Sequence, residues 1–189
     1  MAQVVLASQS PRRRELLGRV FAEFEVIPSG VEETAAAESP REYVISLAKA
    51  KAQDVASRLP QETLVIGSDT VVVLDGKILE KPKDEEDAFR MLSSMSGRMH
   101  EVYTGLALCK DGEVLSDCEV TKVWFRPLSE DAINRYIASG EPMDKAGAYG
   151  IQQKGALLVK GIEGDYFNVV GLPLCKLCEL LDELGYTTL

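Results

Sequence analysis

The sequence is poor in the side chains that build the common transition-metal sites. It contains one histidine, His100, which excludes a centre held by several histidines. We expect its four cysteines to be reduced thiols, because nothing at the N-terminus resembles a secretory signal. Two of them, Cys175 and Cys178, form a single C-x-x-C in an amphipathic helix. We expect this pair to be buried as small hydrophobic residues rather than to bind zinc.

Long hydrophobic runs and positive charge are also scarce. No apolar run approaches the length of a membrane span, about 18 residues. Lys and Arg number 21 against 30 Asp and Glu, so the net charge is −9 and the surface should repel nucleic acid and anionic membranes. We therefore expect a cytoplasmic protein without a nucleic-acid or membrane partner. An anionic substrate would need a local basic pocket or a bound metal ion.

Three motifs of common nucleotide and ester chemistry are absent. The sequence has no G-x-x-x-x-G-K-[ST] phosphate loop, no G-x-G-x-x-G fingerprint and no G-x-S-x-G nucleophile elbow. Nothing near His100 marks a nucleophile triad, so we interpret it as a structural histidine.

The patterns that are present alternate between strand and helix, which predicts an α/β fold with helices packed on a sheet. Helix starts are marked by Ser10 with Pro11, by a capping box over residues 39–42, and by Asp84 and Ser129. The predicted helices cover residues 10–20, 39–59, 84–97, 129–140 and 173–184, and the strands 3–7, 24–27, 64–74, 77–80, 102–109, 114–125, 156–159 and 166–170. No repeat or low-complexity linker divides the chain, which predicts a single domain over residues 1–189.

Residues 8–13, Ser-Gln-Ser-Pro-Arg-Arg, join a strand to the start of a helix. Free backbone N–H groups and the positive end of the helix dipole favour an anion at such a position. Ser8 adds a hydroxyl, and Arg12 and Arg13 add donors suited to phosphate. A capped surface helix with solvated arginines explains the segment equally well.

Asp69 interrupts an otherwise apolar strand within Gly-Ser-Asp-Thr at residues 67–70. Aspartate is depleted in strands, and a buried carboxylate is costly unless it is paired or bound to a metal. The alternative is an aspartate at a bend between two shorter strands. We favour the functional interpretation, because unpaired polar groups rarely interrupt such runs.

Two lysines are candidates for partners of this carboxylate. Lys51 lies within the apolar stripe of its helix, so it needs a carboxylate or phosphate partner unless it snorkels to solvent. Lys81 follows the hairpin after Asp69 and could return toward it, although a solvated turn lysine is the commoner case.

A glycine-rich polar loop over residues 140–152 is a candidate binding loop, and a plain connector is the alternative. Its last residue, Gln152, offers both an amide donor and an acceptor. Glu32 and Glu33 follow a strand and could supply carboxylate to a metal.

Together these segments resemble the Maf family of nucleotide pyrophosphatases. The match runs in the expected order over nearly the whole chain and comprises residues 8–13, 32–33, 47–52, 67–70, 80–82, 96–97, 100–104, 141–152 and 168–173. Each motif alone is weak, whereas the ordered set is highly specific.

The resemblance implies a mixed twisted sheet with helices on both faces, two lobes around a deep cleft, and a homodimer. It implies cleavage between the α- and β-phosphates of pyrimidine or non-canonical nucleoside triphosphates. The family's catalytic aspartate falls on Asp69, and its charged pocket residues fall on Arg12, Arg13, Glu33, Lys51 and Lys81.

Base choice in the family is associated with positions that match Arg12, Thr70 and Gln152. Residues 148–152, Ala-Tyr-Gly-Ile-Gln, resemble the branch that acts on dTTP and UTP. A glutamine amide complements the adjacent donor and acceptor of a uracil or thymine edge. One departure is Gln153, where this branch commonly has glycine.

The mechanistic hypothesis combines these residues. Ser8, Arg13, Lys51 and Lys81 would bind the phosphates, and Mg²⁺ or Mn²⁺ would be held by Asp69 and Glu33. Three alternatives remain at this point: a nucleotide-binding regulator of cell division that does not hydrolyse, a 7-methyl-GTP pyrophosphatase, and a phosphosugar-binding domain.

Overall fold

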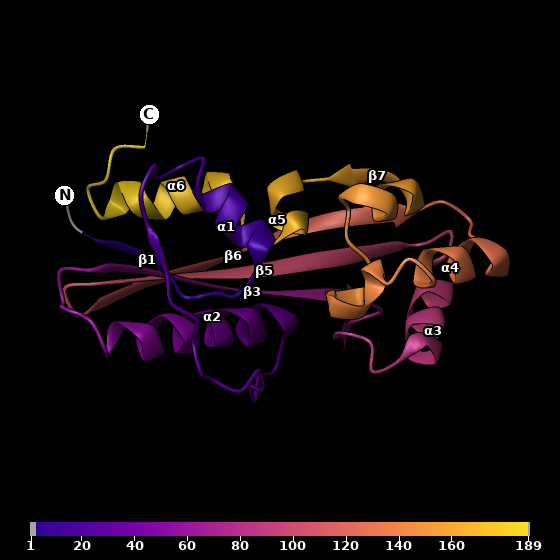
Figure 1. Ribbon diagram of the computed structural model, residues 1–189, viewed down its shortest axis with the longest axis horizontal. Helices are drawn as coiled ribbons and strands as arrows, with labels where there is room; N and C mark the ends of the chain where they lie inside the picture. Colours follow the sequence, from indigo (N-terminus) through magenta and orange to yellow (C-terminus); the bar gives the residue numbers. More distant parts are fainter. Residues whose placement is uncertain (1–2, 189) are drawn as a thin grey trace.

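The computed structural model describes residues 3–188, and its centre is a seven-stranded mixed sheet with the order β2-β1-β3-β5-β6-β7, in which β4 also pairs with β3 (Figure 1). β1 runs parallel to β2 and β3. The pairs β3–β5, β5–β6 and β6–β7 are antiparallel. The strands are β1 Val4–Leu6, β2 Glu25–Val26, β3 Leu64–Leu74, β4 Lys77–Leu79, β5 Met99–Lys110, β6 Glu113–Phe125 and β7 Val159–Glu163.

Helices lie on both faces of the sheet, as predicted. α2 covers one face, α1, α5 and α6 lie on the other, and α3 and α4 pack at the far end (Figure 1). The helices are α1 Pro11–Leu17, α2 Pro40–Ala56, α3 Glu85–Met95, α4 Glu130–Ile137, α5 Tyr166–Val170 and α6 Leu174–Glu183, with 3₁₀ segments η1 Glu141–Asp144, η2 Ala146–Ala148 and η3 Gln153–Leu158. The side chains of Ser10, Ser39, Asp84 and Ser129 cap α1 to α4, as their sequence signals predict.

Alternation along β3 divides its side chains between the two faces. Ile66 and Val72 join the large core that contains residues of α1 and α6, whereas Val65 packs in the cluster formed with α2. The same period of two places Asp69 on the α2 side of the strand and Thr70 on the opposite side. Neighbouring residues of one strand thus meet different helices.

β3 is partly unpaired on one side, and we call this place the sheet gap. β1 pairs with residues 64–66 and β4 with residues 72–74. Within residues 3–188 no strand pairs between them, so residues 67–71 of β3 have only β5 as a strand neighbour. The polar break in the apolar run therefore coincides with the gap between β1 and β4.

α2 approaches the sheet closely at two glycines. A Cβ atom on Gly67 would lie 2.4 Å from the backbone oxygen of Ala48, and one on Gly105 would lie 2.3 Å from that of Val44. Gly105 is the direct partner of Asp69 in the β3–β5 register. The absence of side chains at these positions brings the helix near enough for its lysine to reach the strand.

We expect Gly105→Ala to destabilise the protein, because α2 must move away from the sheet to admit the methyl group. The expected loss is about 1–3 kcal/mol of unfolding free energy, the usual cost of overpacking a core. Urea denaturation measures it. Gly161→Ala is the matched control, because a Cβ atom at this strand glycine meets nothing within 4 Å. Equal stability of the two variants would contradict the close-packing argument.

Two strand predictions near the C-terminus were wrong, the first entirely and the second in part. Residues 166–170 form helix α5 instead of a strand, because the side chain of Asp165 accepts a hydrogen bond from the Phe167 N–H and caps the segment. Residues 156–158 belong to the 3₁₀ segment η3, and strand β7 begins only at Val159.

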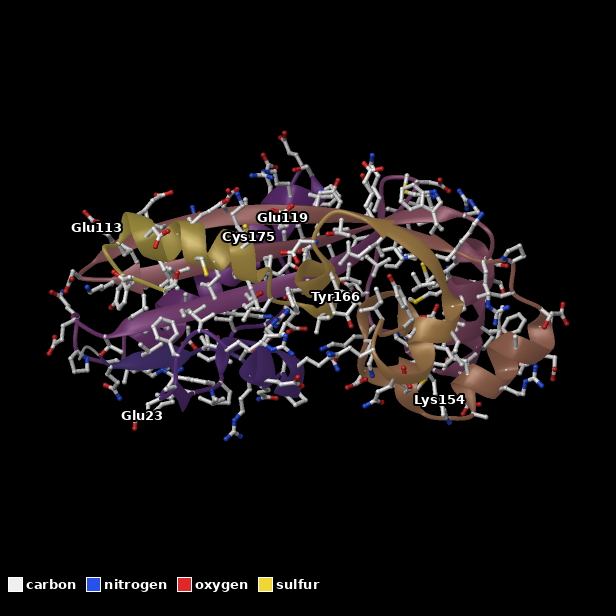
Figure 2. The ribbon with its side chains drawn as sticks, turned by 90° about the horizontal axis from the view of Figure 1, so that it is seen from above. Glu23, Glu113, Glu119, Lys154, Tyr166 and Cys175 are labelled. Atoms are coloured by element: carbon white, nitrogen blue, oxygen red, sulfur yellow. The ribbon has the colours of Figure 1, made fainter. Side chains whose placement is uncertain are left out.

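The cysteine pair on α6 also differs from the prediction. Cys175, which Figure 2 labels on α6, is exposed, and Cys178 is half-buried. α6 buries the side of the helix that carries Leu177, Leu180 and Leu181, and at 100° per residue Cys175 points away from it. None of the helices within residues 3–188 has the length and apolar character needed to cross a membrane.

Candidate functional site

A pocket of about 700 Å³ lies at the sheet gap. Its volume falls in the range of small-molecule sites. Ser8 enters it directly after β1, and Lys81 enters it shortly after β4, so the two strands that flank the gap deliver residues to its rim. All nine residues predicted for the site line this one pocket: Ser8, Arg12, Arg13, Glu33, Lys51, Asp69, Thr70, Lys81 and Gln152.

Lys51 bridges two carboxylates at the pocket floor. Its Nζ atom lies 2.7 Å from Oδ1 of Asp69 and 2.8 Å from Oε1 of Glu33. Lys51 and Asp69 are each 7% exposed, so the ion pair is largely shielded from water. Lys51 therefore finds a carboxylate partner and does not snorkel. The outer oxygen of Glu33 lies 3.5 Å from Nζ of Lys81, which stands at the exposed end of the cluster.

Glu33 is the exposed carboxylate of this cluster, and its neighbours keep it ionised. The hydrogen bond from Lys51 lowers the pKa of Glu33 against the opposing effect of partial burial. Tyr43 on α2 contacts the loop between β2 and α2 that carries Glu33. Its hydroxyl lies 3.2 Å from the backbone oxygen of Glu33 and 3.1 Å from Oε1 of Glu80. Burial and these acidic neighbours raise the pKa of Tyr43 to about 12.

Arg13 lies on the other side of β3. Its guanidinium donates to the backbone oxygen of Gly171 at 2.8 Å, to Oγ of Ser8 at 3.3 Å and to Oγ1 of Thr70 at 2.9 Å. Burial lowers the pKa of Arg13, and the charge of Asp69 counteracts this; an arginine nevertheless stays protonated. With five N–H donors in all, Arg13 keeps at most two for a phosphate.

The hydroxyl of Thr70 has a defined direction. Thr104 donates its only hydroxyl hydrogen to the backbone oxygen of Asn168 at 3.0 Å. Because Oγ1 of Thr70 lies 2.9 Å from that of Thr104, the hydrogen between them comes from Thr70. Thr70 also accepts from Arg13, so toward a substrate it can act only as an acceptor.

The opposite wall of the pocket comes from residues 141–153. Arg12 on α1 reaches toward it, with Nη1 3.8 Å from Oδ2 of Asp144. Gln152 lines the pocket and is half-buried. Lys145 also lines it, although our sequence analysis did not single it out; its Nζ donates to the backbone oxygen of Glu141 at 2.6 Å. A loop lysine carries no periodic signal, so only the fold reveals this position.

The pocket also has an apolar part, of which the sequence carried only a partial signal. Val72, Val102, Tyr149, Ile151 and Val170 contribute to the lining. Val72, Val102 and Val170 stand in apolar segments and look like core residues in the sequence, whereas Tyr149 and Ile151 belong to the loop over residues 140–152 that the sequence marks as a candidate binding loop. The pocket thus combines a charged floor with a partly apolar wall, which suits a ligand with both a phosphate chain and a ring.

His100 lies behind this wall and has a structural role, in agreement with the sequence interpretation. It is 1% exposed, and its Nε2 atom lies 2.6 Å from the hydroxyl of Tyr149. Phe125 packs edge-on against both rings. Burial lowers the pKa of His100 to about 4, so the imidazole is neutral in the folded protein at neutral pH.

We expect the buried histidine to make the protein less stable in acid. Between pH 6.5 and about 4 the unfolded chain binds a proton at His100 that the folded chain does not, so unfolding becomes easier as pH falls. The contribution is about 3 kcal/mol by pH 4, at 1.36 kcal/mol per unit of pKa difference. Urea denaturation at pH 7 and pH 4.5 measures it. His100→Gln should flatten the dependence, and an unchanged dependence would contradict this assignment.

Comparison with known proteins gives concordant matches. The sequence model of the family described as Maf-like protein matches residues 3–184. Proteins named dTTP/UTP pyrophosphatase are 54% identical in Thermococcus kodakarensis, over 98% of both chains, and 53% identical in Thermoanaerobacter sp. (strain X514), over 95% of both. The protein of that name from Clostridium perfringens is 50% identical over 99% of this chain and 100% of its own.

A solved structure supports the fold. The HAM1 protein from Coxiella burnetii superposes with a TM-score of 0.51 at 19% sequence identity, covering 97% of this chain and 100% of its own. At this identity the likeness concerns the arrangement of the strands and helices alone.

Proposed function

Because the chain belongs to the Maf family, we propose that it is a nucleoside triphosphate pyrophosphatase, which hydrolyses dTTP and UTP to the nucleoside monophosphate and pyrophosphate. The observation that carries the proposal is the convergence of all nine expected residues on one pocket. These residues come from segments far apart in the chain. Four of them, Arg12, Arg13, Lys51 and Lys81, are positively charged, although the protein has a net charge of −9. The names of the relatives support the choice of dTTP and UTP.

The phosphate chain would lie along the cations at the floor and rim of the pocket. Lys51 and Lys81 would lie at one end of the phosphate chain and Arg12 at the other. Arg13 lies between them and donates a hydrogen bond to Thr70 on β3. Positive groups held in place before the reaction stabilise charge on the departing pyrophosphate without having to reorganise. Ser8 adds a further donor close to Arg13.

A divalent cation, Mg²⁺ or Mn²⁺, fits the donor set of the floor. Asp69 and Glu33 are adjacent, because both contact the same lysine nitrogen. Within residues 3–188 there is no cluster of three or more His, Cys, Asp or Glu suited to a metal. Mg²⁺ is commonly held by one or two carboxylates together with substrate phosphates, so two carboxylates suffice. When bound, such an ion lowers the pKa of water and neutralises phosphate charge.

Asp69 would hold and orient the reacting groups. Its buried position beside Lys51 keeps its side chain in one orientation. We therefore assign Asp69 to positioning water or the cation at the α-phosphate.

The base would contact the wall formed by residues 141–153. Gln152 offers both a donor and an acceptor, which match the edge of uracil or thymine. Thr70 can accept a hydrogen bond but has no hydrogen left to donate. On the opposite side of the pocket, such an acceptor suits an N–H or O–H donor of the nucleotide other than the N3–H group that Gln152 would bind.

A pyrophosphate-release assay tests the proposal. The purified protein is incubated with dTTP, UTP or 7-methyl-GTP in Mg²⁺, Mn²⁺ or EDTA. We expect equal amounts of monophosphate and pyrophosphate from dTTP and UTP, little from 7-methyl-GTP, and none in EDTA. Saturable nucleotide binding without release of pyrophosphate would overturn the enzyme assignment and favour a regulator that acts by binding.

We further propose that the protein acts in the cytoplasm as a homodimer. Both statements extend the family resemblance, and the net charge of −9 is consistent with a protein that avoids nucleic acid and anionic membranes. Analytical ultracentrifugation tests the dimer, and cell fractionation tests the location.

A further inference from the structure

The segment that carries Gln152 folds back on itself. Gly150 and Gly155 approach so closely that a Cβ atom on Gly155 would lie 1.8 Å from the backbone oxygen of Gly150. Between them, Gln153 has a positive φ of 51°, a conformation that non-glycine residues seldom adopt. A turn with such a backbone persists only when surrounding groups hold it.

Two side chains outside the turn hold both of its ends. The N–H of Gly150 donates to the hydroxyl of Tyr136 at 3.2 Å. At the other end, the N–H of Gly155 donates to Oε1 of Glu141 at 2.9 Å, and the N–H of Lys154 donates to Oε2 at 3.2 Å. Lys154 marks this turn in Figure 2.

The two side chains are themselves joined. The hydroxyl of Tyr136 donates to Oε1 of Glu141 at 3.0 Å, so its single hydrogen goes to the carboxylate and its lone pair accepts from Gly150. Tyr136 is 5% exposed at the end of α4, and burial raises its pKa well above the usual value. The hydroxyl therefore stays protonated and continues to donate.

This arrangement is a clamp that consists of Tyr136 and Glu141. We propose that the clamp sets base specificity by fixing the position of the Gln152 amide in the pocket. The inference rests on the proposed function and adds two positioning residues to it. Tyr136 lies outside the pocket lining, and Glu141 lines the pocket at the wall formed by residues 141–153, so the clamp should govern recognition of the base more than cleavage.

The first test is Tyr136→Phe, which removes the hydroxyl and keeps the ring in the core. The N–H of Gly150 then loses its acceptor and the turn loosens. We expect the KM for UTP to rise about tenfold, the effect of one hydrogen bond of about 1.4 kcal/mol, while kcat changes less than about threefold. The preference for UTP over CTP should fall by a similar factor.

Inhibition constants separate the base from the phosphates. The inhibition constant of UMP should rise in Tyr136→Phe, whereas that of inorganic tripolyphosphate, which carries no base, should stay unchanged. Tyr186→Phe is the matched control, because Tyr186 lies near the C-terminus outside the pocket lining. Glu141→Gln is the second variant; it keeps one acceptor oxygen and should show a weaker form of the same KM effect.

A double-mutant cycle connects the clamp to the glutamine. Gln152→Ala should itself reduce the UTP preference, and adding Tyr136→Phe should reduce it no further, because the amide being positioned is gone. Additive effects would overturn the inference. So would folded Tyr136→Phe and Glu141→Gln proteins with unchanged KM and base preference. A wild-type protein that releases no pyrophosphate would instead refute the proposed function.

Discussion

Asp69→Asn should lower turnover of dTTP and UTP by about 10²–10³-fold, the range lost when one preorganised group at the reacting centre is removed. The substitution keeps the shape of the side chain and one oxygen that can accept from Lys51 at 2.7 Å, so the fold should persist. The loss arises because an amide neither binds a divalent cation well nor polarises water. Steady-state pyrophosphate release at saturating UTP measures the effect.

Asp75→Asn provides the control on the same strand–turn segment. Asp75 is exposed, lies outside the pocket and pairs with Arg98. Asparagine tolerates its positive φ of 50°, so this variant should retain full turnover. Near-normal activity of Asp69→Asn, with circular dichroism and thermal unfolding like those of the wild type, would remove Asp69 from the reaction.

Lys51→Met should combine a loss of activity with a loss of stability. Without the ammonium group, Asp69 and Glu33 lose the protein cation that lies between them, and one donor to the phosphates is missing. We expect turnover to fall by about 10²–10³-fold, the cost of removing one charge-stabilising donor. The unfolding free energy should fall by about 3 kcal/mol, because one partner of a largely buried ion pair is gone. Turnover and urea denaturation measure the two effects.

Lys49→Met is the matched control for this variant. Lys49 lies two residues earlier on α2 and outside the pocket lining. The same change in net charge at this position should leave turnover and the free energy of unfolding nearly unaffected. If Lys51→Met and Lys49→Met behaved alike, the loss would be a general effect of charge instead of the loss of the bridge to Asp69.

Several elements could be predicted because their signals are local. β3 occupies the predicted residues 64–74, since a run of β-branched residues bounded by a tight turn needs no distant information. The caps at Ser39 and Asp84 likewise mark the starts of α2 and α3. Residues 166–170 misled the prediction, because a short apolar segment can form a strand or a helix and its neighbours decide.

The site was predictable in its members but not in its geometry. Lys51 could be recognised as a lysine on an apolar stripe, and Asp69 as a carboxylate in an apolar strand. Their 2.7 Å contact depends on glycines at 67 and 105, which bring α2 close to the sheet. Glu33 had no comparable signal, because a carboxylate in a loop resembles any other acidic residue of the surface.

The sequence by itself determined which residues are costly to bury alone, where the chain turns, and that a polar break interrupts a central strand, because these follow from neighbours within a few positions. Only the tertiary structure decided that the break faces an opening between β1 and β4, that Arg13 is committed largely to protein atoms, and that Tyr136 and Glu141 hold the Gln152 turn. These contacts join residues distant in sequence, and their distances depend on how whole helices pack against the sheet.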